Sequence, residues 1–365
     1  MSIEFQVKKR GFSEFRLIER QDDPLGENEI RLNIDIFSFT ANNITYAAAG
    51  DSLGYWQFFP SSDNESGEWG IIPVWSMADV VESNHADVPV GDRLYGYFPP
   101  ATSLVIKPAN VSDEALFDAT AHRQALPPLY NRYSRVLSSP TYDRQADIAR
   151  TLLGPLHMTS FALWDQLRKN DYYGSEQAIV VSASSKTSLG LAHGLSKDES
   201  NIKIVGLTSA RNVEFVKDTG LYDEVIAYEN ATNDLKDVAS IVVDMAGNPD
   251  VKRAIGARLG DNAKYYIKVG ITHWADLGRG SGFEASSDET KEENFFAPSY
   301  ILQRMNELGP KEFDKRASAF MRDTALASFD WMTVEPRAGL EQLAEVYSSI
   351  CDGSLSPDIG IVVQM

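Results

Sequence analysis

Cysteine and positive charge are both scarce in this chain. The 365 residues hold one cysteine, Cys351, which excludes an intramolecular disulfide and disfavours a zinc site built from thiolates. That use of cysteine fits the reducing cytoplasm, where we expect the protein to reside. The formal net charge of −18 disfavours binding to nucleic acid or to anionic membranes, because both need concentrated lysine and arginine.

Long apolar runs are missing as well. No window offers the ~18 apolar residues of a membrane span, and the N-terminal segment lacks the apolar stretch of a signal peptide. We therefore expect a soluble protein with neither membrane nor nucleic acid among its partners. At 43% hydrophobic residues, the chain is long enough for two cores, because single cores stop growing near ~250 to 300 residues.

A strand, a turn and a helix are predicted between Ala178 and Leu195, AIVVSASSKTSLGLAHGL. Residues 178–181 read as a buried strand and residues 188–195 as a helix that packs back on it. In a doubly wound sheet, such a turn meets a helix N-terminus, where a dinucleotide pyrophosphate binds. The glycine fingerprint G-x-G-x-x-G is replaced here by ASSKTSLG, so the alternative is a turn that only caps the helix.

Two other nucleotide motifs are absent. The sequence Ser185-Lys186-Thr187 resembles the end of a P-loop, but Val180 and Ser185 stand where the P-loop needs glycine. Nucleotide hydrolysis is therefore disfavoured. No tyrosine has a lysine four residues later, which disfavours a short-chain reductase.

The end of the next strand favours NADP over NAD. An NAD site places an acid there for the ribose 2′-hydroxyl, whereas an NADP site removes it and brings arginine to the 2′-phosphate. Ser209 and Arg211 fit the NADP pattern. The alternative is a solvated arginine beside a helix.

The remaining chain predicts two kinds of domain. A strand with alternating polarity at 29–37 is typical of a sheet with one wet face, whereas short apolar strands alternate with helices from residue 178 to 269. We predict an inserted segment near 110–150, which is a lid, a subunit contact or a surface excursion. Residues 275–293 are rich in glycine, serine and acids and predict a mobile surface loop.

Polar and aromatic side chains gather between residues 40 and 60. Asn42, Asn43, Tyr46 and Tyr55 accompany Trp56 and two phenylalanines, a mixture that suits the wall of a small-molecule cleft. The alternatives are an aromatic corner of an ordinary core and, for the two asparagines, amides that satisfy backbone groups in a tight turn.

Several segments together resemble the medium-chain dehydrogenase/reductase superfamily, on its zinc-free, quinone-oxidoreductase-like side. These segments, which also point to a little-characterised bacterial branch, are TANNITYAAAG, GYWQFFP, PVWSMADVVES, SASSKTSLG, GLTSARN, VDMAGN and VGITHW. The resemblance implies a mainly β, GroES-like catalytic domain at 1–150, a Rossmann domain with a doubly wound parallel sheet at 151–300, and a return to the catalytic domain at 301–365. Ala41 and Val74 stand at positions where zinc-dependent members have metal ligands, so the resemblance implies no zinc.

The resemblance also implies roles for individual residues. Substrate-facing polar groups are Asn43 and Tyr46 first, followed by Asn42 and Tyr55. Contacts to NADP(H) are Thr159 near the nicotinamide amide, Ser184, Ser185, Lys186 and Thr187 at the pyrophosphate, Ser209, Arg211 and Tyr228 at the 2′-phosphate, and Ala246, Gly247, Gly270 and Ile271 at the ends of the fourth and fifth strands.

The leading hypothesis is an NADPH-dependent reductase of an enone, quinone or similar conjugated carbonyl. One alternative is an NADP-binding redox sensor or partner-binding protein without turnover. Another is a reductase of enoyl thioesters, with Arg123, Arg132, Arg135 and Arg144 in a basic channel. By analogy with the superfamily we expect a homodimer.

Overall fold

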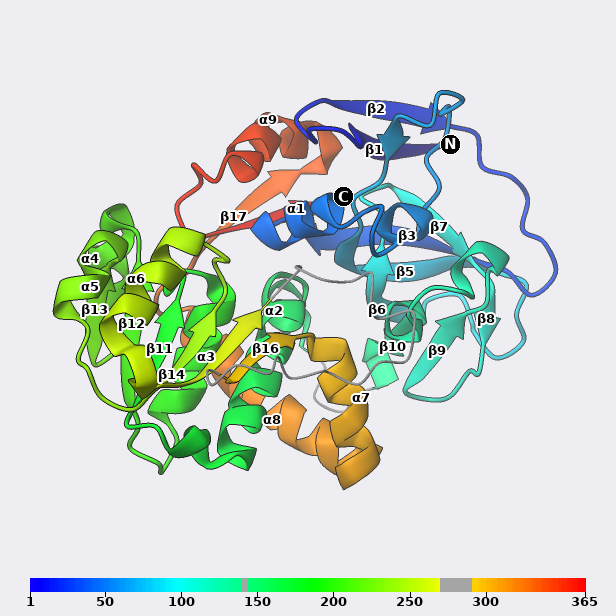
Figure 1. Cartoon of the computed structure of the whole chain (residues 1–365). Helices are drawn as coiled ribbons and strands as arrows, with labels where there is room; N and C mark the ends of the chain where they lie inside the picture. Colours follow the sequence, from blue (N-terminus) through cyan, green and yellow to red (C-terminus); the bar gives the residue numbers. More distant parts are fainter. Residues whose placement is uncertain (139–142, 270–290) are drawn as a thin grey trace. The chain divides into compact units, whose positions relative to one another are not determined.

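The computed structural model describes residues 1–138, 143–269 and 291–365, which form two units (Figure 1). The first unit comprises Met1–Leu152 together with Thr333–Met365, and the second comprises Leu153–Met332. The chain therefore returns to the first unit later than the predicted residue 301. The reason is that Ile301 and Phe313 are buried in the hydrophobic core of the second unit.

The first unit is mainly β-structure. Among its described residues, one sheet has the order β2-β1-β4, and a larger sheet has the order β17-β18-β3-β5-β6-β10-β9-β8 with β7 paired to β3. The strands are β1 (Ser2–Lys8), β2 (Phe15–Arg20), β3 (Ile30–Ser38), β4 (Trp69–Gly70), β5 (Val74–Ser83), β6 (Arg93–Phe98), β7 (Ser103–Ile106), β8 (Pro108–Ala109), β9 (Ala115–Asp118), β10 (Arg132–Arg135), β17 (Thr333–Ala338) and β18 (Ile359–Gln364), and the α-helices are α1 (Ala41–Ala48) and α9 (Gly339–Cys351).

Strand β3 holds the large sheet together. Its residues Ile30, Leu32 and Ile34 are buried while Asn33 is exposed, so the alternation in the sequence corresponds to one core face and one wet face. The last strand of the chain, β18, pairs antiparallel with β3. The C-terminal segment thus completes a sheet that the N-terminal segment begins.

The predicted insertion near 110–150 contributes two strands to the large sheet. Strand β10 pairs antiparallel with both β6 and β9. Arg123, in the same segment, is only 1% exposed. Its guanidinium donates hydrogen bonds to Asp118 at 3.0 Å, to the Tyr133 hydroxyl at 2.7 Å and to the carbonyl of Tyr130 at 2.7 Å. A buried charge needs hydrogen-bonding partners of this kind. Because these polar partners lie among the apolar residues of the segment, its sequence shows no simple hydrophobic periodicity.

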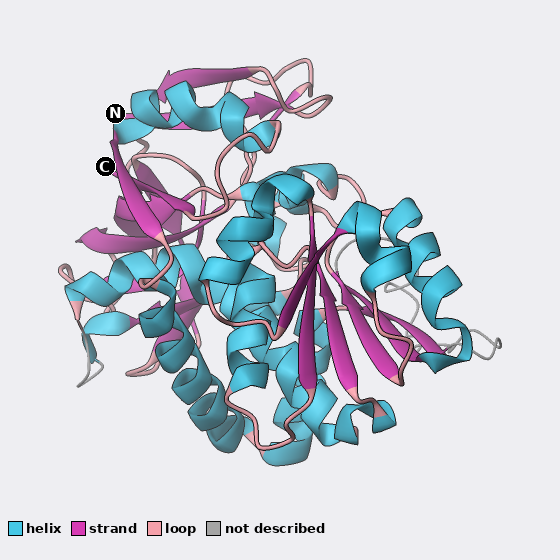
Figure 2. Cartoon of the chain, turned by 90° about the vertical axis from the view of Figure 1, so that its left-hand side faces the viewer, coloured by secondary structure: helices cyan, strands magenta, loops and turns pink. Residues whose placement is uncertain are grey.

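The second unit has the predicted doubly wound α/β fold. Its described residues contain a six-stranded sheet of order β13-β12-β11-β14-β15-β16 in which every pairing is parallel, with helices on both faces (Figure 2). The elements are α2 (Arg144–Lys169, which begins in the first unit), β11 (Gln177–Val181), α3 (Lys186–Ser196), β12 (Lys203–Thr208), α4 (Val213–Asp218), β13 (Glu224–Ala227), α5 (Ala231–Asp234), β14 (Ser240–Asp244), α6 (Pro249–Leu259), β15 (Ala263–Val269), β16 (Lys291–Phe295), α7 (Ala297–Leu308) and α8 (Pro310–Ser328). The predicted loop at 275–293 lies outside the described residues, apart from its last three, which begin β16.

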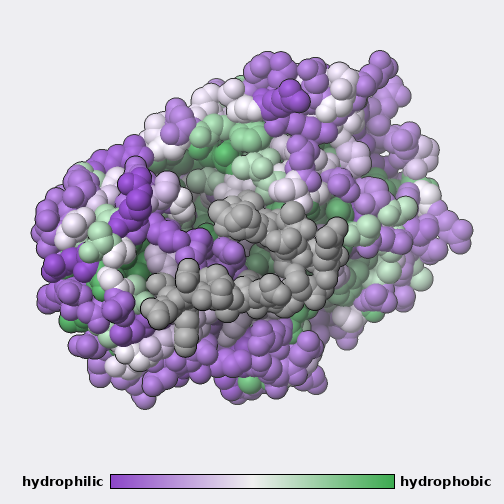
Figure 3. Space-filling model, in the orientation of Figure 1, coloured by the Kyte–Doolittle hydropathy of each residue, from purple (hydrophilic) through white to green (hydrophobic). Residues whose placement is uncertain are grey.

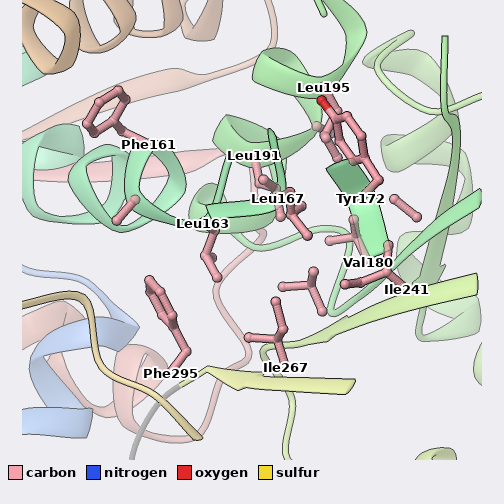
Figure 4. Packing of buried hydrophobic residues seen from close by; sticks show 14 of the residues in the cluster. Phe161, Leu163, Leu167, Tyr172, Val180, Leu191, Leu195, Ile241, Ile267 and Phe295 are labelled. Atoms are coloured by element: carbon pink, nitrogen blue, oxygen red, sulfur yellow. The ribbon is translucent and has the colours of Figure 1, made fainter. Parts of the chain in front are cut away.

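Successive residues of the central strands enter two separate cores. Val180 and Ile241 point into the cluster formed with α2, α3, α7 and α8 (Figure 4). Ile179 and Val242 enter the cluster on the face of α6. Burying a Leu, Ile or Val side chain contributes ~1.5 to 3 kcal/mol, so a strand that is buried on both faces is strongly held. Continuous apolar runs such as AIVV follow from this geometry.

The surface of the chain is predominantly hydrophilic on the face shown in Figure 3. Among the described residues, no helix is both long enough and apolar enough to cross a membrane.

Candidate functional site

The candidate cofactor site lies at the carboxyl edge of the parallel sheet. With strands numbered from β11, the spatial order is 3-2-1-4-5-6, and the chain changes direction across the sheet between β11 and β14. Ligands of doubly wound sheets bind outside the carboxyl ends of the strands at this switch point. All predicted contacts that follow β11, β12, β13 and β14 lie at this edge.

The turn after β11 leads directly into helix α3. Ser185 is the N-cap: its Oγ accepts a hydrogen bond from the Ser188 amide at 3.2 Å and donates to the Ser188 Oγ at 2.8 Å. The cap predicted as the alternative is thus present. The first helical turn carries no acidic side chain, and among the described residues the Thr187 N–H has no acceptor. This helix start therefore leaves a backbone donor for an anion.

Ser184 connects this turn to the next strand. Its Oγ accepts hydrogen bonds from the Asn212 amide at 3.0 Å and from the Thr208 hydroxyl at 3.3 Å, and the residue is 8% exposed. Ser209 and the exposed Arg211 follow Thr208 in the same segment. The structure thus brings the predicted pyrophosphate and 2′-phosphate segments together, with Ser184 serving as a link between them.

The ends of β13 and β14 complete the described part of the edge. Tyr228 follows β13; burial raises the pKa of its hydroxyl, and hydrogen bonding to Ser182 opposes that rise. Gly247 has φ +63, a left-handed conformation that favours glycine, and it lies with Ala246 in the exposed turn after β14. Gly270 and Ile271 lie outside the described residues.

Asp244, which the sequence reasoning missed, organises that turn. Its Oδ1 accepts hydrogen bonds from the amides of Ala246 at 2.8 Å and Gly247 at 3.0 Å, and its Oδ2 accepts from the Tyr266 hydroxyl at 2.6 Å. The side chain is buried. An aspartate that is followed by glycine three residues later at a strand end was the available signal for such a turn.

Helix α2 contributes Thr159 and a second missed residue, Ser160. The hydroxyl of Thr159, which is half-buried, donates to the carbonyl of Pro155 at 3.2 Å. Ser160 is fully buried, and its Oγ lies 2.7 Å from the Thr187 carbonyl. The first turn of α3 is therefore attached to α2 next to Thr159.

In the first unit, Asn43 has a structural role. It lies in helix α1 rather than in a tight turn, and its Oδ1 accepts a hydrogen bond from the Thr40 amide at 2.8 Å. Its Nδ2 donates to the carbonyl of Pro73 at 2.9 Å. Both ends of this amide, 4% exposed, are occupied by backbone groups, so Asn43 anchors α1 beside β5.

Tyr46 lies one helical turn from Asn42, on the same face of α1. Its hydroxyl oxygen accepts hydrogen bonds from the Asn42 side chain at 2.9 Å and from the Trp75 indole at 3.2 Å. Burial is the main cause that raises the pKa of Tyr46, and the two hydrogen bonds lower it in part. Trp75, on β5, is a further residue that the sequence reasoning missed as a partner of this site.

Tyr55 and its neighbours form an aromatic core. The Tyr55 hydroxyl is 2.9 Å from that of Tyr130, and the ring is 4.8 Å from the ring of Tyr46. Trp56, Phe58 and Phe59 are 8% exposed or less. These residues therefore form an aromatic corner of an ordinary core, which was the alternative to a cleft wall. Tyr46 and Asn42 lie at one side of this corner.

The four arginines proposed for a basic channel do not form one cluster of free charge. Arg123 is buried with Asp118, Arg135 pairs with Asp92 at 2.6 Å, and Arg144 pairs with Asp35 at 2.8 Å. Arg132 donates to the Ser134 hydroxyl at 2.8 Å. Each arginine has a different partner, so the four do not support a basic channel for an enoyl thioester.

Two hollows in the described residues lie away from the predicted site residues. One, of about 210 Å³, is in the first unit beside Phe58, Phe59 and Arg123. The other, of about 390 Å³, is at the amino edge of the parallel sheet beside Tyr172 and Ser175. In a doubly wound sheet the carboxyl edge is the position at which ligands bind, so volume alone does not identify the site here.

The mainly β unit and the doubly wound unit confirm, at the level of the fold, the resemblance to the medium-chain dehydrogenase/reductase superfamily. A family model described as "Protein of unknown function (DUF2855)" matches residues 37–356, and the chain belongs to this family. No curated protein matches the chain in sequence.

Solved structures agree with this architecture over the full chain. CurA in complex with NADPH from Vibrio vulnificus has a TM-score of 0.61 and 14% identity, covering 100% of this chain and 99% of its own. A putative NADPH:quinone reductase from Bacillus thuringiensis has a TM-score of 0.60 and 13% identity, with 100% and 99% covered. CurK enoyl reductase has a TM-score of 0.58 and 10% identity, with the same coverage. At such identities the likeness concerns the fold.

A metal centre finds no support in the described part of the chain, which contains no group of three or more His, Cys, Asp or Glu side chains that could hold an ion. Ala41 and Val74, at the positions aligned with zinc ligands, carry no ligating atom.

Proposed function

We propose that this protein is an NADPH-dependent oxidoreductase that reduces a small conjugated carbonyl, an enone or a quinone. The observation that carries the proposal is the carboxyl edge of the parallel sheet. There a capped helix start is linked through Ser184 to the segment that bears Arg211. Structures with this fold that contain NADPH, or are described as quinone or enoyl reductases, support the choice of reaction.

In this proposal, bound NADPH supplies the hydride, and the residues of the chain hold it and supply a proton. The start of α3 binds the pyrophosphate through its backbone amides, with Ser185 and Lys186 at the turn. Arg211 binds the 2′-phosphate, because a guanidinium forms paired, charge-assisted hydrogen bonds with phosphate oxygens. Ala246 and Gly247 flank the nicotinamide ribose, and Tyr46 faces the acceptor.

Nucleotide binding tests the first half of the proposal. Titration with NADPH and NADH, followed by protein fluorescence, is expected to give tighter binding of NADPH. The preference should fall about tenfold or more in Arg211→Ala, since hydrogen bonds to charged groups are worth ~1.5 to 3 kcal/mol. Arg253→Ala, which removes an exposed arginine on α6 of the same unit, is the matched control and should change nothing. Equal binding of both nucleotides would contradict the NADP assignment.

Turnover tests the second half. Oxidation of NADPH is followed with a panel of enones, quinones and aldehydes. Tight NADPH binding without turnover on any acceptor would favour a redox sensor or a partner-binding role instead. The predicted homodimer and cytoplasmic location stay predictions, which analytical ultracentrifugation and cell fractionation address.

A further inference from the structure

The hollow of about 210 Å³ is lined by residues of the first unit alone. Its walls are largely apolar: Phe58, Phe59 and Ile71 are buried, and Leu104 and Val105 are half-buried. Pockets for drug-sized ligands measure ~300 to 1,000 Å³, so this hollow suits a smaller molecule, such as a single ring. The polar groups that line it decide which ring it can hold.

Glu4 contributes a carboxylate oxygen that has no hydrogen-bond donor. Its Oε1 accepts hydrogen bonds from the Ser62 amide at 2.7 Å and from the side chain of Gln6, which Arg16 holds at 2.7 Å. Glu4 is only 5% exposed. Within the described part of the chain, its Oε2 makes no hydrogen bond, because the Nε of Arg20 lies 3.8 Å away. Buried acceptors need donors, so this oxygen offers a binding position to a ligand.

Arg20 contributes the matching donors. Its half-buried guanidinium lines the hollow beside Glu4 and has no closer acceptor among the described residues. The second ion pair at the hollow is already satisfied, since Asp118 accepts from the Thr120 amide at 2.9 Å and from Arg123 at 3.0 Å. Recognition of a polar group therefore depends on the Glu4 acceptor and the Arg20 donors.

Opposite charges side by side select a neutral head group. A carboxylate would pair with Arg20 but would lie against the carboxylate of Glu4, and an ammonium group would pair with Glu4 but would face Arg20. A primary carboxamide places an N–H donor and a carbonyl acceptor in one planar group without net charge. It can therefore donate to Glu4 and accept from Arg20 at the same time.

We propose that this hollow binds a small aromatic primary carboxamide of the benzamide class. The amide lies between Glu4 and Arg20, and the ring packs against Phe58, Phe59 and Ile71. Aromatic side chains favour such contacts with a flat ring. The proposal goes beyond the proposed oxidoreductase activity, and it requires neither NADPH nor any residue of the second unit.

The experiment is a calorimetric titration of the full chain with three ligands that share one ring: benzamide, benzoate and benzylamine. Benzamide should bind with a Kd of about 0.1 to 1 mM, as expected for a ligand of its size. Benzoate and benzylamine should each bind at least about tenfold more weakly, because each leaves a like charge beside its own. Equal binding of benzamide and benzoate, or no binding of benzamide at about 10 mM, would overturn the proposal.

Glu4→Gln should reverse the preference. Its oxygen still accepts from Ser62 and Gln6, and its NH₂ group stands in the place of Oε2, so that two donors face the ligand. Benzamide should bind about tenfold more weakly and benzoate about tenfold more tightly, because the like charge is gone. Unfolding cannot create a gain of benzoate binding. Glu27→Gln, at an exposed position of the same unit, is the matched control, and an unchanged preference in Glu4→Gln would contradict the assignment.

Arg20→Met tests the donor side of the same site. It should weaken benzamide binding about tenfold and strengthen benzylamine binding, since Glu4 then faces the ligand without a neighbouring cation. Arg10→Met removes an exposed arginine of the same unit and should leave both affinities unchanged. Equal effects of the two arginine substitutions would place binding elsewhere and overturn the proposal.

Discussion

Replacement of Asp244 by alanine is expected to destabilise the second unit and its β14 turn. The buried carboxylate accepts hydrogen bonds from the amides of Ala246 and Gly247 and from the Tyr266 hydroxyl. Each hydrogen bond to a charged group contributes ~1.5 to 3 kcal/mol, so the three together would amount to ~4.5 to 9 kcal/mol. Because Ala246 and Gly247 are exposed, their amides can form hydrogen bonds with water in the variant, which offsets part of the loss. We therefore expect a decrease of about 3 to 5 kcal/mol in the free energy of unfolding.

Two conservative variants divide that loss. Asp244→Asn keeps the shape and one oxygen acceptor, and it should cost about 1 to 2 kcal/mol through the lost charge. Tyr266→Phe removes a single donor and should cost about 1.5 to 3 kcal/mol. A double-mutant cycle between Asp244→Ala and Tyr266→Phe should give a coupling free energy of similar size, because both changes remove the same bond.

Urea unfolding followed by circular dichroism provides the measurement, with the m value as a check that the same transition is compared. NADPH affinity, measured in parallel, should fall in Asp244→Ala because the turn that carries Gly247 loses its anchor. A loss below about 1 kcal/mol in Asp244→Ala, or no coupling with Tyr266→Phe, would refute the reasoning, since the carboxylate would then not hold the turn.

Arg123→Ala should lower the free energy of unfolding by about 3 to 5 kcal/mol because it leaves the buried Asp118 carboxylate without its cation, whereas exposed Arg132→Ala should cost about 0.5 kcal/mol or less; equal costs would contradict the buried pair. Burial lowers the pKa of His157 from 6.5 to about 3, so its contribution to stability is complete above pH 6.5 and is lost as pH falls through 3. His157→Leu should therefore reduce the acid sensitivity of Tm, and an unchanged profile would argue against this cause. Burial raises the pKa of Tyr133 from 10 to about 12, so stability should stay full below pH 10 and fall by about 2 to 3 kcal/mol by pH 12, less so in Tyr133→Phe.

The positions of the strand ends in the second unit could be predicted because they depend on local pattern. Buried strands read as apolar runs, and the polar turn after each run marks its carboxyl end. Helix α6, Pro249–Leu259, lies in the region for which alternating strands and helices were predicted. Strand β16 was missed, because KEENF is charged and edge strands tolerate such residues.

Side-chain partners were predicted less well than elements. Asn43 was ranked as a catalytic residue, yet its amide bonds the carbonyl of Pro73, and Arg123 was placed in a channel, yet it lies in the core. The sequence gives no sign of these partners, because a buried polar residue and an exposed one look alike until the surrounding segments are placed. The helix after β11, in contrast, was predicted within two residues of its observed start at Lys186, because that assignment needs only neighbouring residues.

Local sequence patterns were enough to predict the alternation of strands and helices, the two cores, and the positions of the polar residues that follow each parallel strand. These properties arise from periodicity and local backbone chemistry, which act within a few residues. Three other features depend on contacts between distant segments: β10 joins the large sheet, the chain returns to that sheet at Thr333, and Trp75 donates to the hydroxyl of Tyr46. Such contacts join residues far apart in the chain, and they are selected by the sum of many packing interactions that no local pattern records.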